Sequence, residues 1–171
     1  PYPVAWSINA KSIGMEYPMI CFNFGRVEED GTYSERTKYG MIGVIIHEVG
    51  HNYFPMIVNS DERQWTWMDE GLNTFYEQRY MAKFWPERPV GVDVLGRQID
   101  INQLGYLYTA RQGMDQAPDT RSDSLSRMNY WISAYSKPAL TLQQLEAQVS
   151  TDAFDKAMRA YYDDWKFRHP Q

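Results

Sequence analysis

The sequence predicts a mainly α-helical domain with a small β-sheet near its start. Alternating apolar and polar residues, the pattern of half-buried strands, are confined to residues 1–24. The rest of the chain consists of longer stretches bounded by helix-capping residues and prolines. A chain of 171 residues that is 43% hydrophobic is large enough for a real core, since proteins of this size bury roughly 70% of their unfolded surface. We therefore expect one domain, or a large piece of one, over residues 1–171.

The start of the chain favours one or two short strands. The run Met19–Phe22 is apolar, and Pro3 and Pro18 interrupt the alternation around it. Because proline cannot donate to a strand ladder, one of these strands is expected at a sheet edge. Residues 25–32 are polar and predict a turn.

A first helix is expected directly after this turn. The run Thr32–Glu35 has the form of a capping box, so Thr32 is the expected cap. The helix should run to about Phe54, where Pro55 ends it. Its middle, Met41–Val49, is almost wholly apolar, which indicates a buried helix.

Further helices are predicted from caps and proline stops. Thr66 opens the second helix, Pro138 lies in the first turn of the fourth, and Thr151 caps the fifth. Asp115–Ser124 is a polar loop. The expected helices cover residues 66–84, 92–110, 138–149 and 151–168.

Charge and cysteine content exclude several classes of protein. The net charge of −5 argues against a nucleic-acid binder with a general basic surface. Cys21 is the only cysteine, so neither an internal disulfide nor a thiolate metal cluster can form. The sequence contains no apolar run approaching the roughly 20 residues of a membrane-spanning helix. We expect a segment of a longer chain, with the other domains of that chain as partners. The cellular compartment stays open, because a single cysteine suits the cytoplasm or the periplasm; a periplasmic or secreted setting is slightly favoured.

The main chemical signal is the run His47-Glu48-Val49-Gly50-His51. Two histidines at i and i+4 lie about 40° apart around a helix, so both imidazoles can reach one metal ion. Glu48 projects beside that ion, in the position of a general base acting on an activated water. The alternative is a pair of buried histidines with ordinary hydrogen bonds.

A third ligand is needed for a catalytic zinc site. Glu70 lies 19 positions after His51, at the start of the second helix. The connection is long enough to reverse direction and bring that helix alongside the first. Glu77, two turns further on the same face, is a candidate to accept a hydrogen bond from a ligand histidine. The alternative for Glu77 is a solvated carboxylate.

These residues resemble the gluzincin metallopeptidases. Glu70 stands in the run Trp67-Met68-Asp69-Glu70-Gly71, and upstream Gly14-Met15-Glu16-Tyr17-Pro18 is similar to the Gly-x-Met-Glu-Asn signature of the aminopeptidase N and leukotriene hydrolase family. Downstream, Tyr135-Ser136-Lys137-Pro138 resembles that family's Tyr-Glu-Lys-Gly. The sequence departs from these patterns at Ile13, Tyr17, Ser136 and Pro138.

The resemblance implies a thermolysin-like (gluzincin) catalytic domain with one Zn²⁺ held by His47, His51 and Glu70. It implies that the strand carrying Gly14, Met15 and Glu16 lines the substrate cleft, where Glu16 binds the free amino terminus of a peptide. The same resemblance implies that Tyr135 stabilises the tetrahedral oxyanion.

The residues themselves support parts of this interpretation. A glycine at position 14 would let a substrate backbone approach, and a carboxylate at Glu16 can pair with an ammonium group. Trp65 and Trp67 are expected in core packing, Cys21 as a small buried hydrophobe, and His169 receives no role.

The sequence therefore predicts a zinc metallopeptidase, most simply an aminopeptidase, in which Glu48 is the general base and a peptide is the substrate. Two alternatives stay open at this point. One is a zinc endopeptidase on the same scaffold, and the other is a catalytically inactive peptide-binding homologue.

Overall fold

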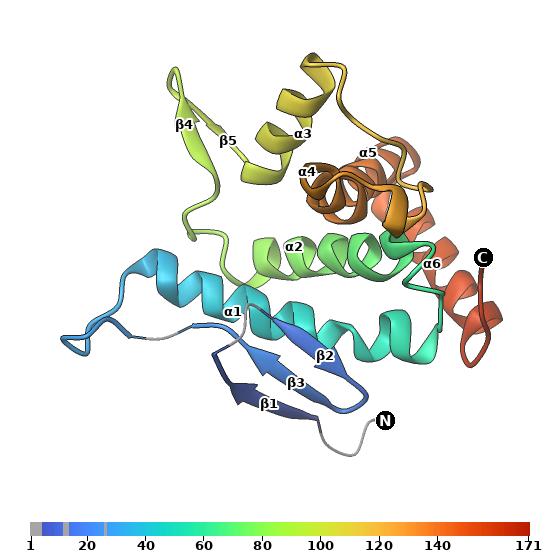
Figure 1. Cartoon of the computed structure of the whole chain (residues 1–171), viewed down its shortest axis with the longest axis horizontal. Helices are drawn as coiled ribbons and strands as arrows, with labels where there is room; N and C mark the ends of the chain where they lie inside the picture. The colour runs from blue at the N-terminus through green and yellow to red at the C-terminus, as the bar shows by residue number, and fades with distance from the viewer. Residues whose placement is uncertain (1–4, 12–13, 26) are drawn as a thin grey trace.

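The computed structural model describes residues 5–11, 14–25 and 27–171, and its N-terminal part forms a small mixed sheet (Figure 1). The central strand pairs with one parallel and one antiparallel neighbour, in the order β1-β3-β2. Three strands are present where one or two were expected, and β2, which Pro18 follows, is an edge strand as predicted. Pro3 and Ile13 lie outside the described residues. The strands are β1 (Trp6–Asn9), β2 (Met15–Tyr17) and β3 (Ile20–Asn23).

The first helix, α1 (Glu35–Gly50), differs from the prediction at both ends. Its cap is Ser34, whose hydroxyl accepts a hydrogen bond from the Thr37 amide at 3.1 Å. Thr32 turns its hydroxyl to Asp30 instead. The helix ends at Gly50 and is followed by the π-helical segment η1 (Asn52–Ile57), in which Phe54 is extended because a proline follows it.

The apolar middle of α1 is half-buried rather than buried. Helix α1 packs against β3 on one side and against α2 on another. Its remaining face, which includes Gly40, Gly43 and Val44, lines an open cleft. The prediction of a buried helix was wrong because a cleft wall can be as apolar as a core.

The second helix is confirmed over the expected range, as the π-helical turn η2 (Trp67–Gly71) followed by α2 (Leu72–Phe84). It runs antiparallel to α1: Gly50 faces Asn73 at one end, and the Tyr39 hydroxyl lies 3.3 Å from Glu87 Oε1 at the other. A Cβ at Gly50 would collide with the Asn73 side chain, so glycine permits this close approach.

The helix expected over residues 92–110 begins only at residue 101. Strands β4 (Val92–Val94) and β5 (Arg97–Ile99) form a hairpin before α3 (Ile101–Arg111). Leu95 and Gly96 both have positive φ, 55° and 78°, which is the geometry of a two-residue hairpin turn. The prediction missed this turn because leucine is rarely found at positive φ.

The C-terminal helices close the fold. Helices α5 (Lys137–Val149) and α6 (Thr151–Trp165) confirm the last two predicted, although Ser150 rather than Thr151 caps α6. The expected polar loop contains the short turn η3 (Ser122–Ser124). The pair α4 (Arg127–Trp131) and η4 (Ile132–Ser136) was not predicted. None of the described helices has both the length and the apolar character needed to cross a membrane.

The core lies where α2 meets α5, α6 and the η1 segment. Its two clusters are Phe54, Val58, Met68 and Leu72, and Phe75, Ala139 and Phe154. Trp65 and Trp67 pack against the first cluster, which confirms their predicted packing role. Cys21 is 3% exposed, as expected of a small buried hydrophobe.

Candidate metal centre and substrate cleft

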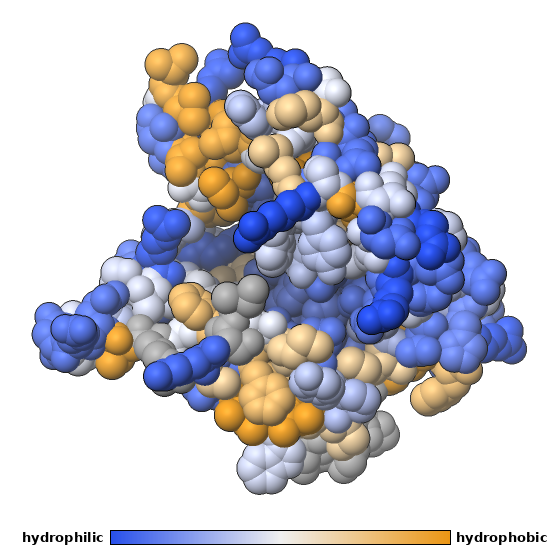
Figure 2. All heavy atoms as spheres, viewed as in Figure 1, coloured by the Kyte–Doolittle hydropathy of each residue, from blue (hydrophilic) through white to orange (hydrophobic). Residues whose placement is uncertain are grey.

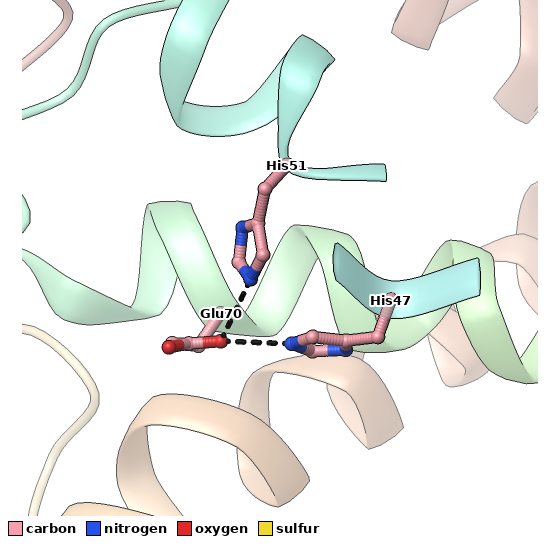
Figure 3. Close-up of side chains that lie close together, drawn as sticks. All are labelled: His47, His51 and Glu70. Atoms are coloured by element: carbon pink, nitrogen blue, oxygen red, sulfur yellow. Dashed lines mark hydrogen bonds and ion pairs between the residues drawn. The ribbon is translucent and has the colours of Figure 1, made fainter. Parts of the chain in front are cut away.

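Three polar side chains from two packed elements meet at one point (Figure 3). His47 lies in the last turn of α1, His51 follows one turn later as the C-cap residue of that helix, and η2 carries Glu70 opposite them. Glu70 Oε2 lies 3.0 Å from His47 Nε2 and 3.4 Å from His51 Nε2. The ligand atoms of all three residues lie within 4.8 Å of one another. The structure thus brings together the three residues that the sequence selected as metal ligands.

The outer ring nitrogens of both histidines are engaged. His47 Nδ1 lies 3.1 Å from Glu77 Oε2, the contact expected for Glu77. His51 Nδ1 lies 2.8 Å from the Phe54 carbonyl oxygen and 2.9 Å from Asp69 Oδ1. These contacts fix both rings with Nε2 turned toward the shared centre.

Asp69 was not among the sequence candidates, although it directly precedes Glu70. It is buried, and burial raises the pKa of its carboxyl group. An acid next to a predicted acidic ligand was the available signal, because a buried carboxylate needs a nearby cation or donor.

The charges around the centre fit a divalent cation. Burial opposes protonation of His47, yet its hydrogen bonds to Glu70 and Glu77 raise its pKa to about 9. His51 behaves in the same way, since Asp69 and Glu70 overcome burial and raise its pKa to about 11. For Glu70, burial raises the pKa, but the two histidines outweigh it and hold the pKa at about 2.

This site therefore favours positive charge at its centre. Two nitrogen ligands and one carboxylate oxygen are the donor set of a catalytic zinc site, so the residues present fit zinc.

Glu48 lies beside the cluster with an unsatisfied oxygen. It is 6% exposed, burial raises its pKa to about 7, and its Oε2 has no hydrogen-bond partner among the described residues. Gly14, at φ +132°, approaches it so closely that a Cβ would collide with Glu48 Oε1. Glycine at this position thus makes room for Glu48, a reason that the sequence analysis did not give.

Strand β2 turns one predicted substrate residue into the cleft and another away. Glu16 Oε2 lies 3.9 Å from His51 Nε2, and burial raises the pKa of the Glu16 carboxyl group. Glu16 and Gly14 line the cleft. Met15 points to the opposite face of the strand and is 39% exposed, so the structure does not bring its side chain to the cleft.

Tyr135 faces the cluster from η4, across the cleft from β2. Its ring stacks on His47 with centroids 6.0 Å apart and an interplanar angle of 17°. Burial, and after it the charge of Glu70, raises the pKa of the phenol well above its usual value, so the group stays a hydrogen-bond donor. Trp131, which the sequence analysis did not select, also lines the cleft, and its ring centroid lies 5.0 Å from that of Tyr135.

The cluster opens into a cleft of about 690 Å³. Figure 2 shows the surface hollowed between the β4–β5 hairpin and the side of the molecule that carries the sheet and α1. A cleft of this volume can hold several residues of an extended peptide.

Two histidines and a glutamate on packed helices, with a buried glutamate beside them, form the arrangement used by zinc hydrolases. The chain matches the Peptidase family M1 domain over residues 9–171, and it belongs to that family.

The chain is similar to several aminopeptidases. It is 26% identical to the alanine/arginine aminopeptidase of Saccharomyces cerevisiae, over 72% of this chain and 14% of that protein. It is 23% identical to human endoplasmic reticulum aminopeptidase 1, over 80% of this chain and 14% of that protein. With mouse aminopeptidase Q the identity is 21%, over 77% of this chain and 24% of that protein. The chain therefore spans a quarter or less of the length of these relatives.

A solved structure shares the fold. A crystal structure of a mutant M1 zinc metallopeptidase from Deinococcus radiodurans aligns with 96% of this chain and 32% of that one, with a TM-score of 0.58 and 17% identity. This likeness supports the expected fold class, mainly α with a small sheet near the start.

Proposed function

We propose that this chain carries the catalytic centre of a zinc-dependent aminopeptidase. The observation that carries the proposal is the convergence of His47, His51 and Glu70 on one point beside a buried Glu48, whose Oε2 has no hydrogen-bond partner among the described residues. The names of the similar proteins support a peptide substrate with a free amino terminus.

His47, His51 and Glu70 would hold one zinc ion, with Glu77 and Asp69 orienting the histidine rings. When bound, the ion supplies Lewis acidity to the scissile carbonyl and to water.

The side chains around the centre have complementary roles in peptide hydrolysis. Glu48 takes the proton of the attacking water and passes it to the leaving amine, a task that suits a carboxylate whose pKa is raised by burial. The Tyr135 phenol donates a hydrogen bond to the oxyanion of the tetrahedral intermediate.

Glu16 would select the free amine. Its carboxylate lies on the His51 side of the centre and is partly desolvated, so an ammonium group there gains a charge-assisted hydrogen bond. An acetylated amine has no charge to offer, and it would leave the carboxylate buried without a partner.

The deciding experiment compares peptides with free and N-acetylated amino termini on the zinc-loaded protein. We expect cleavage of the free peptides one residue at a time and at least tenfold weaker cleavage of the acetylated ones. Glu16→Ala should raise KM for free peptides and reduce the difference in cleavage between free and acetylated peptides. Efficient cleavage of acetylated peptides at internal bonds would identify an endopeptidase, and zinc binding with no cleavage of either set would identify an inactive peptide-binding protein.

A further inference from the structure

The cleft continues well past the metal centre, toward the start of α1. Arg36, three turns before His47, and Arg88, which follows α2, both line it. Antiparallel packing of the two helices brings these positions to the same end, where the Tyr39 hydroxyl meets Glu87. This end lies on the opposite side of the centre from Glu16, which neighbours His51.

Neither arginine has an ion-pair partner in the part of the chain that the structure describes. Arg88 Nη1 donates a hydrogen bond to the Trp85 carbonyl oxygen, at 3.2 Å.

The acids nearby have other partners. Glu87 accepts from Tyr39, and Asp100 caps α3 through the Asn102 amide at 2.8 Å.

The cleft is therefore electrically polar along its length. Glu16, Glu48, Glu70 and Glu77 line its centre and its β2 end. Arg36 and Arg88 line the far end together with Asp100, whose carboxylate caps α3, so positive charge exceeds negative charge among the lining residues there. A peptide with an ammonium group at one end and a carboxylate toward the other matches this distribution.

We propose that Arg36 and Arg88 bind a carboxylate of the peptide on the leaving-group side of the scissile bond. The proposal rests on the proposed peptidase function and adds a second specificity determinant to it. The carboxylate comes from the carboxyl terminus of a short peptide or from an acidic side chain, and the experiment separates these sources.

Helix geometry sets the distance of this site from the scissile bond. Eleven residues separate Arg36 from His47, which corresponds to about 16 Å along the helix axis. An extended peptide advances about 3.3 Å per residue, so about five residues span this length. Since an arginine side chain can bind a carboxylate some way from its own Cα, the bound carboxylate should lie roughly three to five residues beyond the scissile bond.

The first test measures binding without turnover. Zinc-loaded Glu48→Gln protein, made with all of the polypeptide its gene encodes, is titrated calorimetrically with a pentapeptide acid and with its carboxy-terminal amide. The acid should bind about three- to tenfold more tightly, and the difference should shrink in high salt. Adding Arg36→Gln or Arg88→Gln should reduce or abolish this difference. Lys38→Gln, which removes a charge from the same helix outside the cleft lining, should preserve it.

The second test measures cleavage by protein that retains Glu48. An aminoacyl coumarin amide has no carboxylate, so Arg36→Gln and Arg88→Gln should cleave it at the wild-type rate. A terminal-carboxylate site predicts that free acids of four to six residues have the lowest KM. If the site binds an acidic side chain instead, amidated peptides with Asp three to five residues beyond the scissile bond should also have a low KM.

The outcomes separate the two proposals. Failure to cleave the coumarin amide or any peptide would remove the proposed function, while the binding test would still report on the arginines. Equal affinity for acid, amide and Asp-containing peptides, or an acid preference that persists in both arginine variants, would overturn the carboxylate site.

Discussion

At the residue scale, a substitution at Glu48 tests catalysis separately from metal binding. Its carboxylate is buried beside the two histidines but is not part of the group formed by His47, His51 and Glu70. Glu48→Gln should therefore leave zinc content near the wild-type value and lower kcat by about 10²–10⁴-fold, the range for loss of a general base.

Metal analysis and steady-state kinetics on the same preparation check this prediction. His51→Ala is the matched contrast, because it should lose both zinc and activity. Normal kcat in fully zinc-loaded Glu48→Gln would exclude Glu48 as the base.

Glu77 contacts a proposed metal ligand rather than the metal itself. Its Oε2 lies 3.1 Å from His47 Nδ1 and should hold the imidazole in the tautomer that presents Nε2 to the metal. Glu77→Ala should therefore weaken zinc affinity by about 10–100-fold. Competition with a chelator measures this affinity.

A control for Glu77→Ala comes from the next position along α2. Gln78→Ala changes a neighbouring residue whose contact is with Gln143, away from the histidines. Equal zinc affinity in Glu77→Ala and wild type would return Glu77 to the alternative role of a solvated carboxylate.

At the element scale, one arginine joins three helices. Arg79 on α2 makes two hydrogen bonds to Asp155 on α6, at 2.6 and 3.2 Å, and lies 3.4 Å from Glu146 on α5. The bond to Arg79 lowers the pKa of Asp155 below its ordinary value. A carboxyl group whose pKa is lowered on folding stabilises the fold at pH values above its pKa in the unfolded state. This stabilisation is lost as the pH falls through the pKa of the group in the folded state.

Asp155→Asn should therefore cost about 0.5–1 kcal/mol of unfolding free energy at pH 7, a value limited by partial solvent exposure. The difference from wild type should vanish as the pH falls below about 3.9, the ordinary Asp pKa. Urea unfolding at several pH values, with chelator present throughout, measures it. Asp164→Asn, on the same helix with no ion pair among the described residues, is the control; an equal loss there would show that Arg79 contributes nothing specific.

At the scale of the whole molecule, the sequence predicted the metal centre better than its surroundings. The i, i+4 spacing of His47 and His51 places both on one helix face regardless of the rest of the fold, so their meeting could be predicted. The hairpin turn at Leu95 could not, because its residue type disfavours the backbone conformation that it adopts. The positions of Arg36 and Arg88 at one end of the cleft also escaped prediction, since they depend on how α1 and α2 pack.

A metal centre built from two elements also predicts how the whole fold responds to zinc. His47 lies on α1, His51 is the C-cap residue of that helix and Glu70 lies on η2, so a bound ion ties together segments that separate on unfolding. A ligand present at 100 times its Kd stabilises the native state by about 2.7 kcal/mol. For a domain of this size, that energy raises Tm by about 5–10 °C. Thermal unfolding in zinc and in chelator should show this shift in wild type and in His169→Ala, because the His169 ring bonds to the Asn59 carbonyl oxygen and is not part of the cluster. The shift should be lost in His51→Ala. An equal shift in His51→Ala would place zinc binding elsewhere than at His47, His51 and Glu70, and no shift in wild type would show that zinc does not bind the folded protein.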